Sequence, residues 1–112
     1  MEQEGLLAGE ASLVTVTFLF TDIEGSTALW EQEPEAMRVA LQRHNVLLAA
    51  AVQRHGGCVF KTVGDAFCVT FDHAEGAVGA ACQIQSSLAM EAWPTHTPVR
   101  VRSIRSIVSG EE

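Results

Sequence analysis

Two hydrophobic patterns alternate along this chain, and they separate strands from helices. Residues 13–20 are β-branched and aromatic with nearly continuous apolarity, which predicts a central strand covered on both faces. Residues 35–55 and 73–92 instead repeat apolar side chains at intervals of three and four, which predicts two long amphipathic helices. His44 falls within the first of these stripes, and we interpret it as a helix-boundary residue bonded to backbone rather than as a ligand.

Turn and capping residues set the limits of the helices. A short helix is predicted from Ser26, a candidate N-cap, to about Glu31, and Pro34 fits the first turn of the long helix that follows. Gly56-Gly57 is expected to end that helix as a C-cap, and Trp93-Pro94 to end the second long helix. The first twelve residues precede every predicted element and are expected to form a flexible leader.

Three further β-rich runs complete the pattern. Residues 58–62 and 66–71 predict a hairpin in which Gly64 supplies a positive φ, and residues 99–108 predict a last strand. The resulting order is β-α-α-β-β-α-β. With the first two helices taken as one crossover, this is the ferredoxin-like α+β pattern, an antiparallel sheet with helices on one face. In this topology the end of the first strand lies close to the hairpin turn.

Composition restricts the functional classes. With 112 residues the chain suffices for one domain, predicted over residues 13–112. Its formal net charge of −7 argues against a nucleic-acid partner and implies that a polyanionic substrate needs metal ions to screen it. No signal peptide and no membrane segment of ~20 apolar residues is visible. Cys58, Cys68 and Cys82 are interpreted as buried reduced thiols, so a cytoplasmic location is expected.

Two aspartates stand where apolar runs meet glycine turns. Asp22 follows the first strand shortly before Gly25, and Asp65 follows Gly64 in the hairpin turn. Although far apart in sequence, both are brought to one edge of the sheet by the predicted topology. Mg²⁺ prefers oxygen ligands and usually takes one or two carboxylates, with substrate phosphates at other positions. The pair therefore predicts a divalent-metal site, to which the backbone carbonyl of Ile23 adds a third oxygen.

The residues after Asp22 indicate a phosphate site. The amides of residues 24–27 open the short helix, where free N–H groups and the helix dipole favour anions. Lys61 is either a reader of a base or a solvated strand charge. Each feature alone also has a structural interpretation: Asp22 as a helix cap, Gly64-Asp65 as a hairpin dipeptide and Glu24 as a solvated charge. The functional interpretation depends on their combination.

At these same positions the sequence resembles the catalytic domain of class III nucleotide cyclases, the adenylate and guanylate cyclases. Residues 14–27 read VTVTFLFTDIEGST and are similar to the first metal motif of that family. Residues 54–67 read RHGGCVFKTVGDAF and are similar to its second metal motif. The likeness runs from about Val14 to Arg102, and it is strongest toward bacterial cyclases that are joined to ATPase or regulatory modules.

The resemblance implies a reaction and assigns residues to it. Adenylate cyclases are phosphorus-oxygen lyases of signal transduction that convert ATP to cyclic AMP and pyrophosphate. In this family two Mg²⁺ or Mn²⁺ ions promote attack of the ribose 3′-hydroxyl on the α-phosphate. Asp22 and Asp65 would be the catalytic metal ligands together with the carbonyl of Ile23, and Lys61 would recognise adenine. The triphosphate would contact the loop formed by Ile23, Glu24, Gly25, Ser26 and Thr27.

The C-terminal residues depart from the family pattern. After residues 99–102 the family usually continues with a glycine-histidine-threonine-glycine-like strand, whereas here residues 103–112 read SIRSIVSGEE. The segment expected beyond them carries a second base-reading residue, and the asparagine and arginine that position ribose and stabilise the transition state. The family works as dimers with each site built across the interface. The sequence therefore predicts a partial catalytic domain, inactive alone, with ATP and a homodimer mate or complementary cyclase half as partners.

Two other functions stay open on the sequence. One is a non-catalytic, degenerate cyclase homologue that acts as a dimerisation or regulatory module. The other is a diguanylate-cyclase-like domain on a related sheet, but residues 64–67 lack the paired acids of that family's hairpin. Between ATP and GTP, Lys61 alone favours ATP.

Overall fold

The computed structural model describes residues 13–111, and its elements follow the predicted order. In chain order they are β2 (Leu13–Ile23), α2 (Ser26–Gln32), α3 (Pro34–Arg54), β3 (Cys58–Val63), β4 (Ala66–Phe71), α4 (Ala74–Met90) and β5 (Val101–Glu111). The predicted leader, residues 1–12, lies outside the described part of the chain. None of the helices between residues 13 and 111 is long and apolar enough to cross a membrane.

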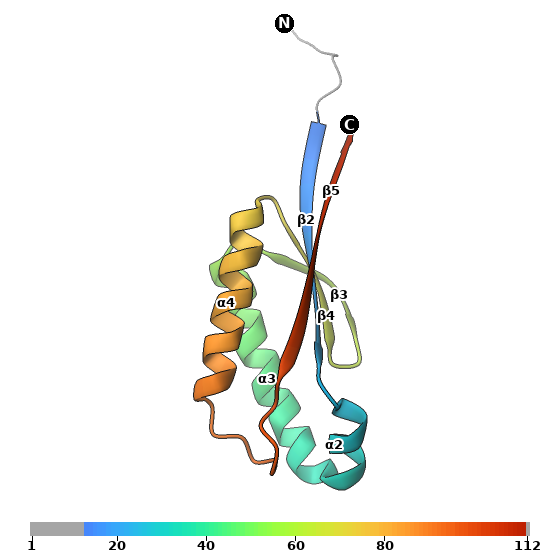
Figure 1. Ribbon diagram of the computed structural model, residues 1–112, viewed down its shortest axis with the longest axis vertical. Coiled ribbons are helices and arrows are strands. Elements are labelled where there is room, and N and C mark those ends of the chain that lie inside the picture. The colour runs from blue at the N-terminus through green and yellow to red at the C-terminus, as the bar shows by residue number, and fades with distance from the viewer. Residues whose placement is uncertain (1–12, 112) are drawn as a thin grey trace, which may run out of the picture.

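The four strands form one antiparallel sheet in the order β3-β4-β2-β5. Figure 1 shows α3 and α4 together on one side of the sheet, with α2 beyond the end of β2. Past the helices, β2 and β5 continue as a paired ribbon in which Leu13 is matched with Glu111 (Figure 1). The α+β class, the element order and the placement of the long helices on one face are confirmed.

The core lies between the sheet and the two long helices. From Thr17 to Ile23 in β2, and along β4, odd-numbered residues point toward the helices, and Leu19, Val69 and Phe71 are almost completely buried there. On α3 the buried positions keep the predicted spacing of three and four, namely Met37, Ala40, His44, Leu48, Ala51 and Val52. Buried residues thus recur every two positions in the strands and every three to four in the helix, and both sets face the same core.

No described element covers the opposite side of the sheet. We call it the open face, and it carries Phe18, Phe20, Phe60, Cys68 and Ile104. The rings of Phe18 and Phe20 stack 5.9 Å apart, and Phe60 meets Phe18 edge-on at 5.8 Å. Phe20 is 37% exposed and its β5 neighbour Ile104 is 68% exposed. The prediction that residues 13–20 are covered on both faces is wrong within this chain, because only one helical layer is present among the described residues.

Two predicted boundaries at the end of the first strand also differ. β2 continues to Ile23 because β5 pairs with it as far as Val101, so Asp22 is a strand residue rather than a turn residue. Ser26 is the first residue of α2 and not its N-cap. The N-cap is Gly25, whose φ of 65° lies in the left-handed region. Because glycine has no side chain, no side-chain hydrogen bond caps this helix.

All three cysteines are free, but the prediction that they are buried is wrong. Cys58 and Cys82 are exposed, and Cys68 is half-buried. Cys58 opens the edge strand β3, Cys82 lies on the solvent side of α4, and Cys68 points to the open face. Apolar neighbours in sequence therefore did not place these thiols in the core, because strand and helix periodicity turned them outward.

Candidate functional site

Asp22 lies on the open face near the end of β2, where Arg102 of β5 binds its carboxylate. The strand register pairs the two residues directly. Arg102 donates from Nε to Oδ1 and from Nη2 to Oδ2, both at 3.1 Å, so the guanidinium engages both oxygens. The pKa of Arg102 lies above its usual value because Asp22 accepts these bonds and adds its negative charge, with a smaller contribution from Glu24. With 46% of its side chain exposed, Asp22 stays within reach of ligands.

Asp65 lies in the two-residue turn Gly64-Asp65 between β3 and β4. Gly64 adopts a φ of 58°, a conformation that favours glycine and fits a tight hairpin. Continued by two residues, the register of β2 with β4 sets Asp65 opposite Ile23. The backbone positions of Asp22 and Asp65 are therefore diagonal neighbours at one end of the sheet, which is where the topology predicts them.

The carbonyl of Ile23 points toward the same hairpin. In an antiparallel strand, successive residues direct their backbone N–H and C=O groups to alternate neighbours. The Glu24 amide donates to the Arg100 carbonyl, just before β5, at 2.8 Å. By alternation, the backbone groups of Ile23 are directed to the other side, where Asp65 stands.

Two carboxylates and one carbonyl suit a hard divalent cation. No three His, Cys, Asp or Glu side chains of the described residues gather into a metal-binding group. The predicted set needs only two, because phosphate and water usually complete the shell of Mg²⁺. The guanidinium of Arg102 already supplies a positive charge at Asp22. The donor set fits the ion, and metal binding itself stays a prediction.

The loop from β2 to α2 offers fewer free amides than the sequence predicts. The Glu24 amide donates to the Arg100 carbonyl and is not available to phosphate. The Gly25 carbonyl accepts the first helical hydrogen bond, from the amide of Leu29 at 3.1 Å. The predicted phosphate contacts by backbone therefore reduce to the amides of residues 25–27.

Lys61 belongs to the open face as well. It pairs with Cys68 of β4, which pairs with Phe20 of β2, so the three lie in one row across the sheet. Asp22 lies one row nearer the end of β2, about 7 Å along the strand. A hollow of about 680 Å³ spans both rows and is lined by Phe20, Asp22, Cys68 and Arg102 among others. A ligand in this hollow would thus lie against Asp22, whereas Lys61 stands on β3 beyond Cys68.

His44 is a buried titratable group close to this end of the sheet. It lies in the middle of α3, fully buried, with its ring perpendicular to that of Phe67 at 5.8 Å. Its Nδ1 donates to Asn45 Oδ1 at 2.8 Å, whereas Nε2 has no partner among the described residues. The interpretation of His44 as a boundary residue bonded to backbone is therefore wrong. Burial lowers the pKa of His44, and the Asn45 bond and the charge of Asp65 oppose this only in part.

The lowered pKa of His44 predicts a loss of stability in acid. The unfolded chain takes up a proton on this residue below its ordinary pKa of about 6.5, whereas the folded protein does so only at lower pH. The stabilisation is therefore complete above about pH 6.5 and is lost as the pH falls, by at most about 1.4 kcal/mol per pH unit for one proton. Urea unfolding of the wild type and of His44→Leu at a series of pH values measures the difference.

The control for this acid effect is His73→Gln, which removes an exposed histidine. Its unfolding free energy should keep the wild-type dependence on pH, whereas His44→Leu should show a shallower one. Equal slopes for the wild type and His44→Leu would show that His44 is not kept neutral by burial.

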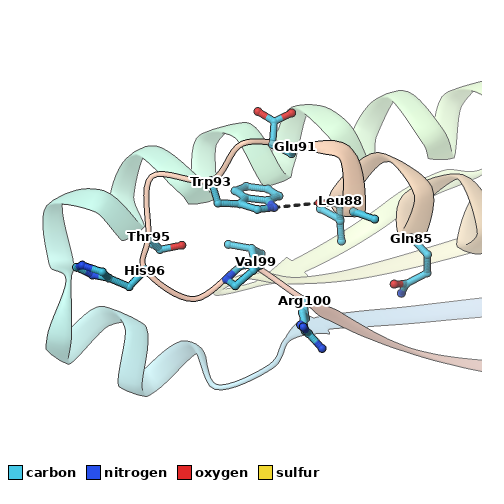
Figure 2. Close-up of a pocket in the computed structure, with 10 residues that line it drawn as sticks. Gln85, Leu88, Glu91, Trp93, Thr95, His96, Val99 and Arg100 are labelled. Atoms are coloured by element: carbon cyan, nitrogen blue, oxygen red, sulfur yellow. Dashed lines mark hydrogen bonds between the residues drawn. The ribbon is translucent and has the colours of Figure 1, made fainter.

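The connection between α4 and β5 encloses a separate pocket of about 560 Å³ (Figure 2). Figure 2 shows Trp93 within it, its indole Nε1–H donating to the carbonyl of Leu88 at 3.0 Å. Glu33, at the junction of α2 and α3, accepts hydrogen bonds from the backbone N–H of His96 and pairs with its ring Nδ1, both at 3.0 Å. These contacts hold the connection against α4 and against the junction of α2 and α3. We interpret the pocket as part of this packing.

The same connection sets which residues of β5 meet β2. Gln85 of α4 donates to the carbonyl of Val101, the first residue of β5, at 3.0 Å. The carbonyl of Arg100 accepts from Glu24 at 2.8 Å. With the start of β5 held in this way, Arg102 is placed on the open face by contacts made outside the site.

Sequence reasoning missed the environment of two residues at or near the candidate site, Arg102 and His44. Arg102 is 80 positions from Asp22, and no local motif marks it as the partner of that carboxylate. The pairing follows only once the register of β5 with β2 is known. His44 was visible as an apolar-stripe position, but its orphan Nε2 becomes apparent only when the helix is packed on β4.

The comparisons with known proteins agree with this fold. The adenylate and guanylate cyclase catalytic domain matches residues 10–107. The match covers most of the chain, and the chain belongs to this family of nucleotide cyclase domains. The resemblance seen in the two metal motifs is thereby confirmed.

Individual relatives give the extent of the likeness. The chain is 42% identical over 80 residues to receptor-type adenylate cyclase B of Leishmania donovani. The matched segment covers 71% of this chain and 6% of that protein. It is 43% identical over 79 residues to an adenylate cyclase of Podospora anserina. This match covers 70% of this chain and 4% of that protein. The chain thus spans only a small part of the length of these curated relatives.

A solved structure confirms the fold at the level of coordinates. An adenylate cyclase of Trypanosoma brucei, analysed in its monomeric state, is 26% identical and superposes with a TM-score of 0.78. The superposition covers 86% of this chain and 56% of that chain. The four-stranded antiparallel sheet and its helices are therefore a cyclase-domain arrangement.

Proposed function

We propose that this chain supplies the metal-binding part of an adenylate cyclase site, which converts ATP to cyclic AMP and pyrophosphate together with a second chain. The observation that carries the proposal is that the backbone positions of Asp22, Ile23 and Asp65 lie together at one end of the sheet. These are the oxygen donors that a divalent cation needs when a polyphosphate completes its shell.

Each group has a role in this proposal. Asp22, Asp65 and the carbonyl of Ile23 would hold one or two Mg²⁺ or Mn²⁺ ions. When bound, such ions neutralise charge on the triphosphate and favour attack by a nearby hydroxyl. The amides of residues 25–27 lie beside Asp22 and would orient phosphate oxygens. Lys61 would read the base from the open face.

The choice of ATP rests on the relatives and on Lys61. The curated relatives described above are named as adenylate cyclases. In the family resemblance, Lys61 occupies the adenine-reading position, and the structure leaves its side chain exposed on β3. ATP is therefore the proposed substrate and GTP the competitor to be tested beside it.

A second chain is part of the proposal because the open face presents a row of exposed apolar side chains. Phe20, Phe60 and Ile104 are 37%, 49% and 68% exposed. A monomer that leaves such a face in water gains by covering it with another sheet surface. A second cyclase chain on this face would also bring its residues to the hollow beside Asp22.

Manganese binding tests the metal assignment directly. Free Mn²⁺ is followed by electron paramagnetic resonance during titration of the wild type, Asp22→Asn, Asp65→Asn and Asp72→Asn. Loss of a group that only supports a metal ligand already costs 10–100-fold in affinity, so losing a ligand should cost about tenfold or more. Asp72 is an exposed aspartate just after β4, and Asp72→Asn removes the same charge without touching the site. Affinities that are equal in all four proteins would refute the assignment.

Catalysis is tested by mixing the chain with a complementary cyclase half that lacks its own metal aspartates. Cyclic AMP should form from ATP with Mn²⁺, more readily than cyclic GMP from GTP, and only when Asp22 and Asp65 are both intact. Manganese binding without any cyclic nucleotide would instead support the regulatory-module alternative.

A further inference from the structure

The cation bound to Asp22 in this structure is a side chain of the protein itself. Both oxygens of the carboxylate accept from the guanidinium of Arg102, at 3.1 Å each. The two residues are direct partners across β2 and β5, so the sheet register places their side chains next to each other on the open face. Asp22 is also the first proposed metal ligand, so this ion pair bears directly on metal binding.

A guanidinium and a divalent cation compete for this carboxylate. Arg102 approaches Asp22 through two donors, which leaves no oxygen free of a positively charged neighbour. A metal ion on either oxygen would lie within a few ångströms of the guanidinium charge, and like charges at that distance repel. Arg102 is 63% exposed and lies at the end of the sheet, so solvent is available to receive it when it leaves.

We propose that Arg102 is the internal counter-cation of Asp22, and that a divalent metal binds this carboxylate by displacing the guanidinium. The proposal rests on the metal role of Asp22 put forward above. In the metal-free state Arg102 holds Asp22 in its open-face orientation and offsets part of its charge. Upon metal binding the bidentate pair opens, and the guanidinium moves to solvent at the rim of the hollow that both residues line. Arg102 is thus a positioning residue that also sets the metal affinity.

The test measures Mn²⁺ affinity at low ionic strength in the wild type, Arg102→Met, Arg102→Lys and Arg100→Met. Removing the competing charge should tighten binding about 3- to 10-fold in Arg102→Met, a modest factor because the pair is exposed. Arg102→Lys keeps the charge without the bidentate geometry and should fall between Arg102→Met and the wild type. Arg100→Met removes an equal charge just before the same strand, and it should change the affinity less than twofold if contact with Asp22 is what matters.

A second measurement follows the guanidinium itself. In the metal-free protein the Arg102 Nε–H is hydrogen-bonded to Asp22, so its ¹⁵N–¹H signal should be protected from exchange with water. Titration with diamagnetic Mg²⁺ should raise its exchange rate, and the signal is assigned by its absence in Arg102→Met. A merely structural ion pair would keep this signal unchanged while metal binds.

The outcomes separate this proposal from the proposed function. If the wild type binds Mn²⁺ through Asp22 but Arg102→Met binds equally or more weakly, the counter-cation role is refuted and the cyclase assignment stands. If neither the wild type nor Arg102→Met binds Mn²⁺, both proposals fail. Tighter binding in Arg102→Met, together with loss of protection of the Nε–H on adding Mg²⁺, supports the exchange.

Discussion

Truncating Phe71 to alanine is expected to lower the free energy of unfolding by about 3–5 kcal/mol, the range for large buried aromatic side chains. Phe71 ends β4 and is only 2% exposed. Its ring fills the space where the end of α3 meets the start of α4, since a Cβ built on Gly57 would lie 2.6 Å from the ring and one on Gly76 would lie 3.0 Å from it. Backbone this close cannot collapse easily into the cavity left by Phe71→Ala. Urea unfolding followed by circular dichroism measures the loss.

The matched control is Phe60→Ala, which removes the same atoms from a phenylalanine that is 49% exposed on the edge strand β3. Its expected cost is about 1 kcal/mol or less, because most exposed substitutions leave no cavity. If Phe71→Ala costs no more than Phe60→Ala, the ring does not fill the helix junction as the structure indicates.

The glycines around Phe71 show how far sequence reasoning reaches. Gly56-Gly57 correctly predicts the end of α3, and Gly56 does take the positive φ, 77°, of a helix stop. Gly57 has a different purpose, because its missing side chain makes room for the Phe71 ring and for Val52. A pattern read along one segment identifies a turn, but it cannot reveal a close approach between segments that are distant in sequence.

The apolar run at residues 13–20 illustrates a second limit. Continuous apolarity predicts burial on both faces, whereas this chain covers only one. The pattern correctly indicates that both faces of the strand carry apolar side chains. It contains no information on whether this chain itself supplies elements to cover both faces. Phe20 is therefore exposed and Phe18 only half-buried, although both belong to an apolar run that predicts burial.

The candidate site divides in a similar way. The meeting of Asp22 and Asp65 at one edge could be predicted, because it follows from element order and from a tight hairpin turn. The ion pair of Asp22 with Arg102 could not be predicted, because it depends on the register of β5 with β2. That register is set by contacts of Gln85 and Glu24 with the start of β5. The topology can be predicted from patterns along the chain, whereas the strand register depends on packing between elements that are distant in sequence.

Replacing Ile104 by aspartate is expected to weaken self-association, or association with a complementary cyclase half, by about 100-fold or more. Ile104 lies on the open face beside Phe20 and is 68% exposed, so Ile104→Asp is expected to leave the folded monomer intact. In an interface on this face the new carboxylate would be buried without a partner. A cost of about 2.7 kcal/mol, small for an unpaired buried charge, already gives a factor of 100. Sedimentation velocity over a range of protein concentrations measures the change.

The location of the interface is tested by Val46→Asp, which makes a similar substitution at a side chain of α3 that is 57% exposed. It adds the same charge to a chain that already carries −7, so it controls for general repulsion between acidic chains. Association should survive Val46→Asp and fail in Ile104→Asp if the open face is the contact surface. The reverse result would move the interface to the helical layer, and it would leave the aromatic cluster of Phe18, Phe20 and Phe60 without the covering chain proposed above. Because the hollow beside Asp22 lies on the same face, the loss of association should also abolish cyclic AMP formation in the mixing assay.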